Sequence, residues 1–305
     1  MINLLKTQKT GLFNSLLLLR FICFCIFLGR GWQHIFRDIP IRTILWNQDI
    51  MKDFVEGYLN ISWYEWGTSL TVDFYINLFV KSVGFMYLLI AVVSLIIQHH
   101  HKKAGLLLPL GVIMLLMLAI LNTLDDNLMG GQFIEHACQI IAPIILYAVI
   151  FEKLSEDKLN FLIKFSIAFT FAGHGLYAMG VHRVPANFVD MTINILHLSE
   201  QHARLFLYYI GIADIIISIT IFIPSLTKVS LMYCIIWGLI TAWARIFGNM
   251  NYDLFWYCLN QSWFETSYRL VHGLLPLYLY LSARKLTITS VKLIYKKAEL
   301  KGTIT

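Results

Sequence analysis

Residues 104–121 read AGLLLPLGVIMLLMLAIL and contain no charged side chain. A stretch of this kind nearly suffices to cross the hydrocarbon core of a bilayer, which takes about 20 mostly apolar residues. The rest of the 305-residue chain has the same character, since 58% of it is hydrophobic and only 14% is charged. Soluble domains carry roughly 25% charged residues. The sequence therefore excludes a soluble globular domain.

Seven further apolar stretches accompany this one, and one of them, residues 82–98, is also free of charge. The other stretches each hold at least one polar or ionisable residue. We predict an all-α polytopic membrane protein with eight transmembrane helices. The expected spans lie near residues 11–34, 74–97, 104–124, 133–152, 159–180, 203–224, 229–248 and 266–283.

The placement of lysine and arginine predicts the orientation of these spans, because positively charged loops stay in the cytoplasm. The N-terminus, the even-numbered connections and the tail together hold thirteen lysine and arginine residues, whereas the opposite loops hold four, namely Arg37, Arg42, Lys52 and Arg183. We therefore expect a multi-pass protein of the plasma membrane, a bacterial inner membrane, with both termini in the cytoplasm. The bilayer is then its first partner.

Two long outer connections, about 35–73 and 181–202, carry apolar residues at helical spacing between charged ones. In the first, Phe54, Val55 and Tyr58 alternate with Asp53 and Glu56. This pattern predicts amphipathic helices that lie along the outer membrane face. An interfacial belt of aromatic side chains is expected on the same side, formed by Trp32, Trp46, Trp63, Trp66 and Trp263.

The second half of the chain repeats the first. Phe27, Gly29 and Gly31 match Phe171, Gly173 and Gly175 at a constant offset, and further matches pair Gly84 with Gly211, Asn122 with Asn249, Asp126 with Asp253 and Pro143 with Pro276. Each unit holds four spans, so both copies enter the membrane the same way round, which predicts a parallel repeat. We divide the chain into a first four-helix membrane repeat, 1–155, and a second, 156–305, that ends in a basic cytoplasmic tail.

The motif Phe-x-Gly-x-Gly near the outer end of the first helix of each unit resembles the DoxX-like superfamily of small membrane proteins. It stands here as Phe27-Leu28-Gly29-Arg30-Gly31 and as Phe171-Ala172-Gly173-His174-Gly175. The resemblance implies an integral membrane protein, linked in some members to quinone or thiol redox chemistry. The chain has five cysteines but no Cys-x-x-Cys pair, so the thiol role lacks its residues.

Ionisable and amide side chains gather in the outer parts of the expected spans. Charged side chains inside a membrane normally face the bundle interior or water, because exposing one at the bilayer centre costs about 2.5–3.5 kcal/mol. We therefore expect an outward-facing polar cavity. Its candidate ligand-binding residues are Arg30, His34, Asn122, Asp126, Glu135 and His136 in the first unit and His174, Arg204, Asn249, Asp253, Arg269 and His272 in the second.

A purely structural interpretation competes with the ligand-binding one. In it, internal ion pairs hold the helices together, for instance Arg30 with Glu135 and Arg269 with Asp253. For His174 and His272, the helix rise of about 1.5 Å per residue places both roughly 9 Å below the outer surface, so the two imidazoles are able to meet. They would then offer hydrogen bonds to a quinone carbonyl or ligands to a haem iron. Haem is disfavoured because the corresponding residues of the first unit, Arg30 and Gln139, are not haem ligands.

The paired glycines have two interpretations, close packing of the first helix of each unit and a close approach of ligand, and we favour packing. Pro143 and Pro276 each lie inside a span and predict a kink. The chain carries no basic stripe for nucleic acid, no zinc-spaced cysteines, no phosphate-binding glycine loop and no nucleophile motif. No residue is therefore assigned to catalysis or to a metal, and enzyme activity is left open.

Three functions fit these observations. The first is a redox-linked membrane component that binds a quinone-like molecule and works with a membrane redox partner. The second is a carrier or permease for an anionic solute or lipid, in which parallel repeats rock against each other. The third is a scaffold without chemistry.

Overall fold

The computed structural model describes residues 2–37, 39–125, 130–181 and 183–282, with side chains from Ser15 onward. Within these ranges every regular element is a helix. Seven helices are long and apolar enough to cross a membrane, and they fall where the sequence predicts the first seven spans. They are Ser15–Phe36, Leu70–Ile96, Lys102–Asp125, Gly130–Ile150, Glu156–Ala178, Glu200–Thr220 and Thr227–Phe247.

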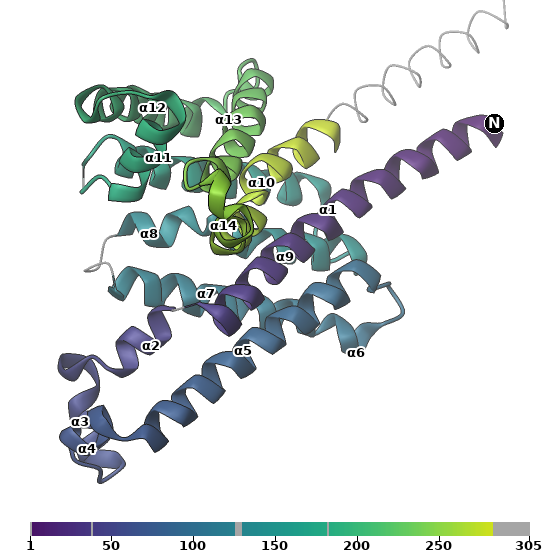
Figure 1. The fold of residues 1–305 in the computed structure, drawn as a ribbon. Helices are drawn as coiled ribbons and strands as arrows, with labels where there is room; N and C mark the ends of the chain where they lie inside the picture. The colour runs from purple at the N-terminus through teal and green to yellow at the C-terminus, as the bar shows by residue number, and fades with distance from the viewer. Residues whose placement is uncertain (1, 38, 126–129, 182, 283–305) are drawn as a thin grey trace, which may run out of the picture.

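Two of these seven segments consist of two helices each. The first span belongs to α1 (Ile2–Phe36) and the second is α5 (Leu70–Ile96). The third joins α6 (Lys102–Gly105) to α7 (Leu107–Asp125), and the fourth joins α8 (Gly130–Glu135) to α9 (Ala137–Ile150). The remaining three are α10 (Glu156–Ala178), α12 (Glu200–Thr220) and α13 (Thr227–Phe247). These helices lie beside one another in an elongated bundle (Figure 1).

The region of the expected eighth span is also helical, but it is interrupted. Helix α14 (Phe255–Arg269) ends at a turn at Leu270, and a second helix occupies residues 271–282. The fourth span is interrupted at a similar place, where His136 separates α8 from α9. Pro143 lies within α9, seven residues beyond this interruption, so the break precedes the proline instead of coinciding with it.

The two connections that the sequence predicts to be amphipathic do form short helices. The first contains α2 (Pro40–Leu45), α3 (Gln48–Tyr58) and α4 (Trp63–Thr68), and the second contains α11 (Ala186–Leu196). Side-chain oxygens of Asn47 and Ser62 accept hydrogen bonds from the first turns of α3 and α4, which fixes where these helices begin. Figure 1 shows α2, α3, α4 and α11 at one side of the bundle and α6 at the other.

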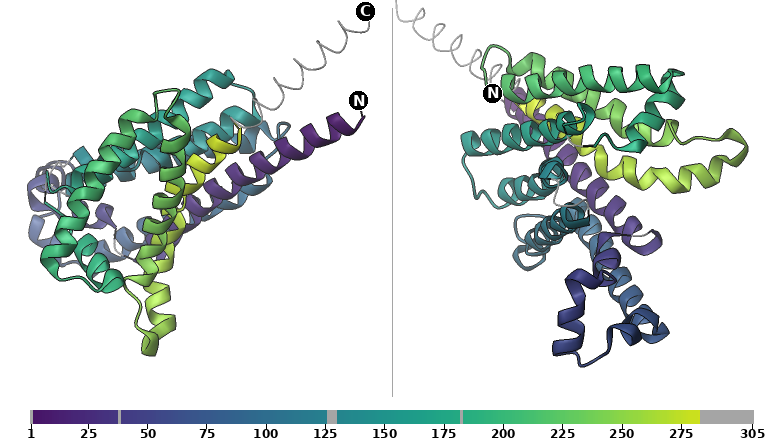
Figure 2. Two further views of the ribbon diagram at one scale, coloured as in Figure 1. Left: turned by 90° about the horizontal axis from the view of Figure 1, so that it is seen from above. Right: turned by 90° about the vertical axis from the view of Figure 1, so that its left-hand side faces the viewer.

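The first glycine of each Phe-x-Gly-x-Gly motif lies against the interrupted helix of the other half of the chain. A Cβ atom added to Gly29 of α1 would lie 2.6 Å from the Phe264 carbonyl oxygen on α14. A Cβ atom added to Gly173 of α10 would lie 3.0 Å from the Glu135 nitrogen and the Gly131 oxygen on α8. Only glycine permits this approach of two backbones, and α1 crosses α14 near the middle of the bundle in Figure 2.

The second glycine of each motif packs within its own half. Gly31 lies against Gly84 of α5, where an added Cβ would be 3.0 Å from the Gly84 oxygen. Gly175 lies against Gly211 of α12 in the same way, with an added Cβ 2.8 Å from the Gly211 oxygen. The packing interpretation of the paired glycines is therefore confirmed. All four glycines lie at close contacts between helices. The side chains next to them in sequence are the ones that form the site.

Candidate functional site

Arg30 of α1 is buried and held in a fixed position by neutral partners. Its Nε and Nη2 atoms donate to the Gln139 Oε1 at 3.0 and 2.8 Å, and its Nη1 donates to Gln33 at 2.8 Å. The guanidinium also lies 3.7 Å from the centre of the Tyr268 ring, a cation–π contact. The Arg30–Glu135 ion pair that the structural interpretation names as an example does not form within the described residues, because Arg30 binds Gln139 of α9 instead.

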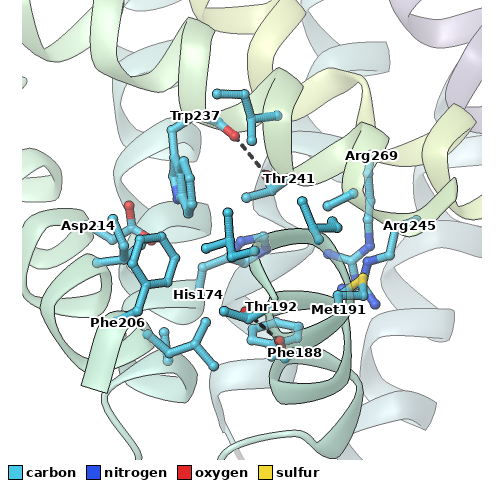
Figure 3. Close-up of a pocket in the computed structure, with 17 residues that line it drawn as sticks. His174, Phe188, Met191, Thr192, Phe206, Asp214, Trp237, Thr241, Arg245 and Arg269 are labelled. Carbon is cyan, nitrogen blue, oxygen red and sulfur yellow. Dashed lines mark hydrogen bonds between the residues drawn. The ribbon is translucent and has the colours of Figure 1, made fainter. Parts of the chain in front are cut away.

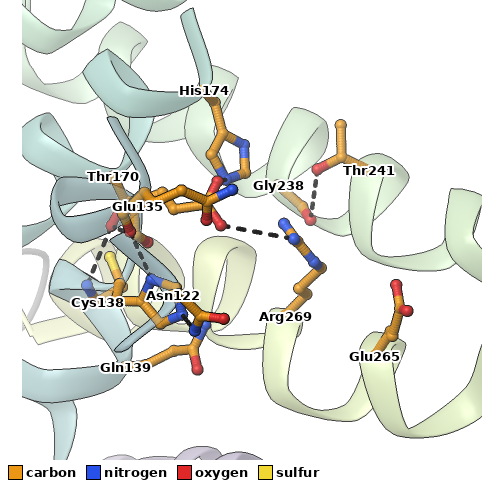
Figure 4. A network of polar contacts seen from close by, with 12 residues as sticks. Asn122, Glu135, Cys138, Gln139, Thr170, His174, Gly238, Thr241, Glu265 and Arg269 are labelled. Carbon is orange, nitrogen blue, oxygen red and sulfur yellow. Dashed lines mark hydrogen bonds and ion pairs between the residues drawn. The ribbon is translucent and has the colours of Figure 1, made fainter. Parts of the chain in front are cut away.

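Glu135, the last residue of α8, lies between a cation and an imidazole from the second half of the chain (Figure 4). Its Oε1 is 3.7 Å from the Arg269 Nη2, and its Oε2 is 3.7 Å from the His174 Nε2. The Arg269–Asp253 ion pair that the sequence suggests is therefore wrong. Asp253 lies in the exposed 3-10 helix η1 (Tyr252–Leu254). This helix precedes α14, whereas Arg269 is the last residue of α14.

His174 and His272 do meet, as their equal depth in the sequence suggests. Their ring centroids are 5.0 Å apart and the rings stand at 82° to each other, so the contact is edge to face. His272 is buried, and neither of its ring nitrogens has a hydrogen-bond partner in the described part of the chain. The His174 Nε2 also has none.

His136 has a defined tautomer because both of its nitrogens are engaged. Its Nδ1 lies 2.6 Å from the Gln132 carbonyl oxygen and must donate to it, since a carbonyl only accepts. Its Nε2 is then the acceptor of the hydrogen bond from the Asn122 amide at 3.3 Å. Asn122 and His136 thus tie α7 to the interruption between α8 and α9.

Arg245 of α13 belongs to the same cluster, although the sequence analysis did not select it. It is buried, its Nη1 lies 3.6 Å from the Glu265 Oε2, and its guanidinium lies 5.3 Å from the Phe188 ring centre. Its position near the outer end of an expected span is the same signal that selects Arg269. Arg245 is covered by α11 and α14, and this arrangement of helices cannot be predicted from the sequence around Arg245.

Five predicted site residues lie elsewhere or outside the described residues. His34 is buried on another side of α1, where its Nδ1 meets the Arg30 carbonyl and its ring packs on Tyr87. Arg204 is exposed and pairs with Glu200 at 2.7 Å within the first turn of α12. Asn249 and Asp253 are exposed beyond the end of α13, and Asp126 lies outside the described residues. The sequence predicts the depth of Arg204, Asn249 and Asp253 in the membrane. It does not predict that the helix ends that carry them point away from the cluster.

A polar cavity of about 140 Å³ lies at the cluster, between the two halves of the chain. Arg30, Glu135 and Arg269 lie in its wall, and α11 contributes Asn187 and Phe188. Its other lining residues are Gln33, Asn122, Gln132, His136, Tyr177, Pro185, Arg245 and Tyr268. Five of the twelve predicted site residues line this cavity, namely Arg30, Asn122, Glu135, His136 and Arg269.

A second cavity of about 150 Å³, which we call the apolar chamber, lies on the other side of Arg245 and Arg269 (Figure 3). Phe206, Ile210, Trp237 and Ile240 are among its walls, and α11 closes it with Phe188, Met191, Thr192, Ile195 and Leu196. Arg245, Arg269 and Phe188 line both cavities, so they form the partition between them. His174 lines the chamber near this partition, whereas Asp214 lies across the chamber from the two arginines in Figure 3.

Asp214 is a second buried acid that the sequence analysis did not select. Its Oδ1 accepts a hydrogen bond from the Tyr233 hydroxyl at 2.7 Å. This donor provides the buried carboxyl group with a polar partner at the apolar end of the chamber.

The partition carries an excess of hydrogen-bond donors and of positive charge. Two arginines of the partition, the buried Arg245 and the partly buried Arg269, and the buried Arg30 beside it stand against two carboxylates, Glu135 and Glu265. The Nε atoms of Arg245 and Arg269 are buried and have no acceptor within the described residues, like the His174 Nε2. Buried polar atoms are nearly always hydrogen-bonded, so this place suits a group that brings acceptor oxygens.

The comparisons with other proteins do not extend this description. No protein-family model, no characterised protein and no solved structure matches the chain.

Proposed function

We propose that the chain is a DoxX-like protein of the bacterial inner membrane that binds a quinone-like molecule and takes part in membrane redox chemistry with a partner protein. The apolar body of the ligand would occupy the apolar chamber. Its oxygen-bearing head would lie at the partition, where Arg245, Arg269 and His174 face it. The chamber and the partition are built by the second half of the chain, and the polar cavity on the other side of the partition is lined by both halves.

One observation carries the proposal, namely the buried nitrogens without acceptors at the mouth of an apolar chamber. The Nε atoms of Arg245 and Arg269 and the Nε2 of His174 all lie at the boundary of this chamber. A hydrocarbon ligand would leave them unpaired at a cost of about 1–3 kcal/mol each, whereas a carbonyl or phenolate oxygen accepts from them. A ligand with an apolar body and an acceptor head fits both features.

The protein groups have separate tasks in this binding mode. Arg245 and Arg269 stabilise negative charge on the head, and His174 donates or accepts a hydrogen bond as its tautomer allows. Glu135, 3.7 Å from both Arg269 and His174, holds these two side chains toward each other across the polar cavity. Glu135 is therefore a positioning residue, and the polar cavity beyond it gives small solutes and protons access to the head.

Two features support the tandem duplication that the DoxX-like assignment requires. Gly29 and Gly173, at matching positions, both press against the interrupted fourth helix of the opposite half. Those helices, α8 with α9 and α14 with 271–282, both break near the cluster. We infer two parallel four-helix units, 1–155 and 156–305, with eight spans and both termini in the cytoplasm.

A carrier for an anionic lipid or solute is the second candidate, and the excess of arginine over glutamate at the partition favours it. A carrier must also open toward the cytoplasm. The two inner-side cations that would line such an opening are already bound, because Arg20 donates to the Leu95 and Ile97 carbonyls and Lys164 donates to Thr227. We therefore place redox-linked binding ahead of transport.

The test is the lipid extract and absorbance spectrum of protein purified in mild detergent. We expect close to one quinone-like molecule per chain in the wild-type extract, and a several-fold smaller amount after Arg245→Met, which removes a guanidinium from the partition. Lys103→Ala, which removes a cation far from the partition, is the matched control and keeps the wild-type content. An extract that holds an anionic lipid instead would support the carrier, and one that holds neither would refute ligand binding.

A further inference from the structure

A third cavity lies between the end of α1, α2 and α5, and it shares no residue with the site described above. It has a volume of about 410 Å³ and is lined by residues at the end of α1, in α2 and in α5. Its polar lining residues are His34, Arg37, Arg42, Asn77 and Lys81. None of these residues takes part in the proposed binding of a quinone-like molecule.

Lys81 occupies an unusual position on α5. It falls in a stripe of exposed apolar residues at spacings of three and four, which places the whole stripe on one face of the helix. The stripe consists of Phe74, Leu78, Phe85, Leu89, Val92 and Ile96, each at least 49% exposed. Such a face of a membrane-spanning helix contacts lipid, and Lys81 is the one charged residue within it.

The depth of Lys81 lets its ammonium group reach the lipid headgroups. Ile96 ends α5 beside the His99–Lys103 turn, and Lys81 lies fifteen residues before it, a distance of about 22 Å along a helix. The hydrocarbon core is about 30 Å thick, so the Lys81 backbone lies roughly 8 Å inside the boundary of the opposite leaflet. A lysine side chain spans most of that distance by snorkelling.

Two arginines stand at the same cavity. Arg42 donates to Asp73 at 2.8 Å and to Asn77 at 3.0 Å, which neutralises Asp73 and fixes the guanidinium at the cavity wall. Arg37 donates to the Asn260 carbonyl at 2.8 Å, and its buried Nε has no acceptor within the described residues. Lys81 forms no ion pair with any residue that the structure describes. The described charges at this cavity are thus three cations and one paired acid.

We propose that Arg37, Arg42 and Lys81 bind the phosphate headgroup of an anionic phospholipid whose acyl chains lie along the exposed stripe of α5. Charge complementarity selects the anionic headgroup, and the lipid-facing stripe continues directly from the cavity into the region of the acyl chains. The site is independent of the quinone-like ligand, since it shares no residue with the chamber or the partition.

The test is lipid retention by native mass spectrometry after reconstitution into nanodiscs of phosphatidylcholine mixed with phosphatidylglycerol. Lys81→Ala is expected to weaken phosphatidylglycerol retention about fivefold, because one surface cation contributes about this factor to anionic lipid binding. Phosphatidylcholine retention should not change, and Lys81→Arg should keep the wild-type preference. Arg37→Gln provides a second, independent removal of charge with the same expected loss.

Lys103→Ala is the matched control, because it removes one lysine from α6, which follows the far end of α5. The proposal is overturned if Lys81→Ala and Arg37→Gln retain phosphatidylglycerol like the wild type. It is also overturned if Lys103→Ala loses as much as Lys81→Ala, or if both lipids are lost in parallel. Exposed Lys81 has no protein partner to lose in the described residues, so the melting temperature of Lys81→Ala should match that of the wild type.

Discussion

Glu135 has the most consequential environment of any single residue in the protein. It is buried at the end of α8, and its two oxygens each lie 3.7 Å from a nitrogen of the second half of the chain, one on Arg269 and one on His174. A buried carboxylate is stable only while it is paired, because the loss of its partner leaves an uncompensated charge in a medium of low polarity. The Glu135–Arg269 ion pair therefore stabilises the fold and, at the same time, positions the side chains of the site.

Arg269→Met should be strongly destabilising for this reason. The change leaves the Glu135 carboxylate without its cation, a loss of about 3–5 kcal/mol for a buried pair. The double variant Arg269→Met with Glu135→Gln should regain most of that stability, because it removes both charges. Unfolding of the purified proteins in mixed detergent measures the difference. A double variant no more stable than Arg269→Met would show that Glu135 and Arg269 do not interact.

The buried histidines allow a matched comparison. His272→Phe should leave the free energy of unfolding within about 0.5 kcal/mol of the wild type, because its ring nitrogens have no partners within the described residues and phenylalanine has a similar shape. His136→Phe should lose about 1–3 kcal/mol, since it leaves the Asn122 amide without its acceptor. Thermal melts of both variants provide the test. Equal losses would show that His272 has a polar partner in the folded protein.

For single residues, the sequence predicts how deep a side chain lies along its helix better than which neighbouring helix the side chain faces. The equal depth of His174 and His272 follows from helix rise, and the two rings do meet. Arg204 and Asp253 share the predicted leaflet but lie at exposed helix ends, because their lateral direction depends on packing that a single sequence does not encode. Arg245 and Asp214 escape selection for the opposite reason, since neighbouring helices bury them only in the folded protein.

Glycine contacts decide how the helices are arranged. Gly29 and Gly173 bring α1 against α14 and α10 against α8, so each contact joins the two halves of the chain. Both contacts lie directly beside the cluster, since Arg30 and His174 each follow one of these glycines in sequence. The same close approach that packs the helices therefore also places the side chains of the site.

Gly29→Ala is expected to destabilise the protein by about 1–3 kcal/mol, because its Cβ would lie 2.6 Å from the Phe264 carbonyl oxygen, a backbone atom that has little room to move. Gly57→Ala in exposed α3 is the control. No atom lies within 4 Å of its added Cβ, so helix propensity should raise stability by up to about 1 kcal/mol. Melting temperatures measure both effects. A Gly29→Ala variant as stable as Gly57→Ala would contradict the packing described here.

Element boundaries follow largely from the sequence. Long apolar runs predict the seven helices of membrane-spanning length, and the spacing of Phe54, Val55 and Tyr58 predicts α3. Pro143 and Pro276 each free a backbone carbonyl one turn earlier, near Gln139 and His272, which predicts a kink there. The breaks, at His136 and Leu270, lie within one turn of these positions. These breaks depend on the helices packed around them and hence on the tertiary fold.

At the scale of the whole molecule, the two halves of the chain are packed against each other through shared helix contacts. Helix α1 lies between α5 of its own half and α14 of the other, and α10 lies between α12 and α8. The largest apolar core likewise draws residues from both halves, among them Phe27, Ile145, Phe171 and Leu275. The polar cavity, which both halves line, is therefore complete only when both are present.

Co-expression of residues 1–154 and 155–305 as separate chains tests this interdependence. The cut falls in the short connection between α9 and α10, away from the cluster. We expect the tagged first half to copurify with the second in detergent, and expect the Gly29→Leu and Gly173→Leu changes together to abolish copurification. Halves that purify separately, or that still associate after both changes, would contradict the described interface.

Photoaffinity labelling with an azido-quinone, followed by peptide mass spectrometry, tests whether the apolar chamber binds a quinone. Label is expected in α11 and α13, where Phe188, Met191, Trp237 and Ala244 line the chamber, and excess unlabelled quinone should prevent it. Label that appears only on the lipid-facing stripe of α5, or that unlabelled quinone fails to displace from α11 and α13, would contradict a quinone-binding chamber.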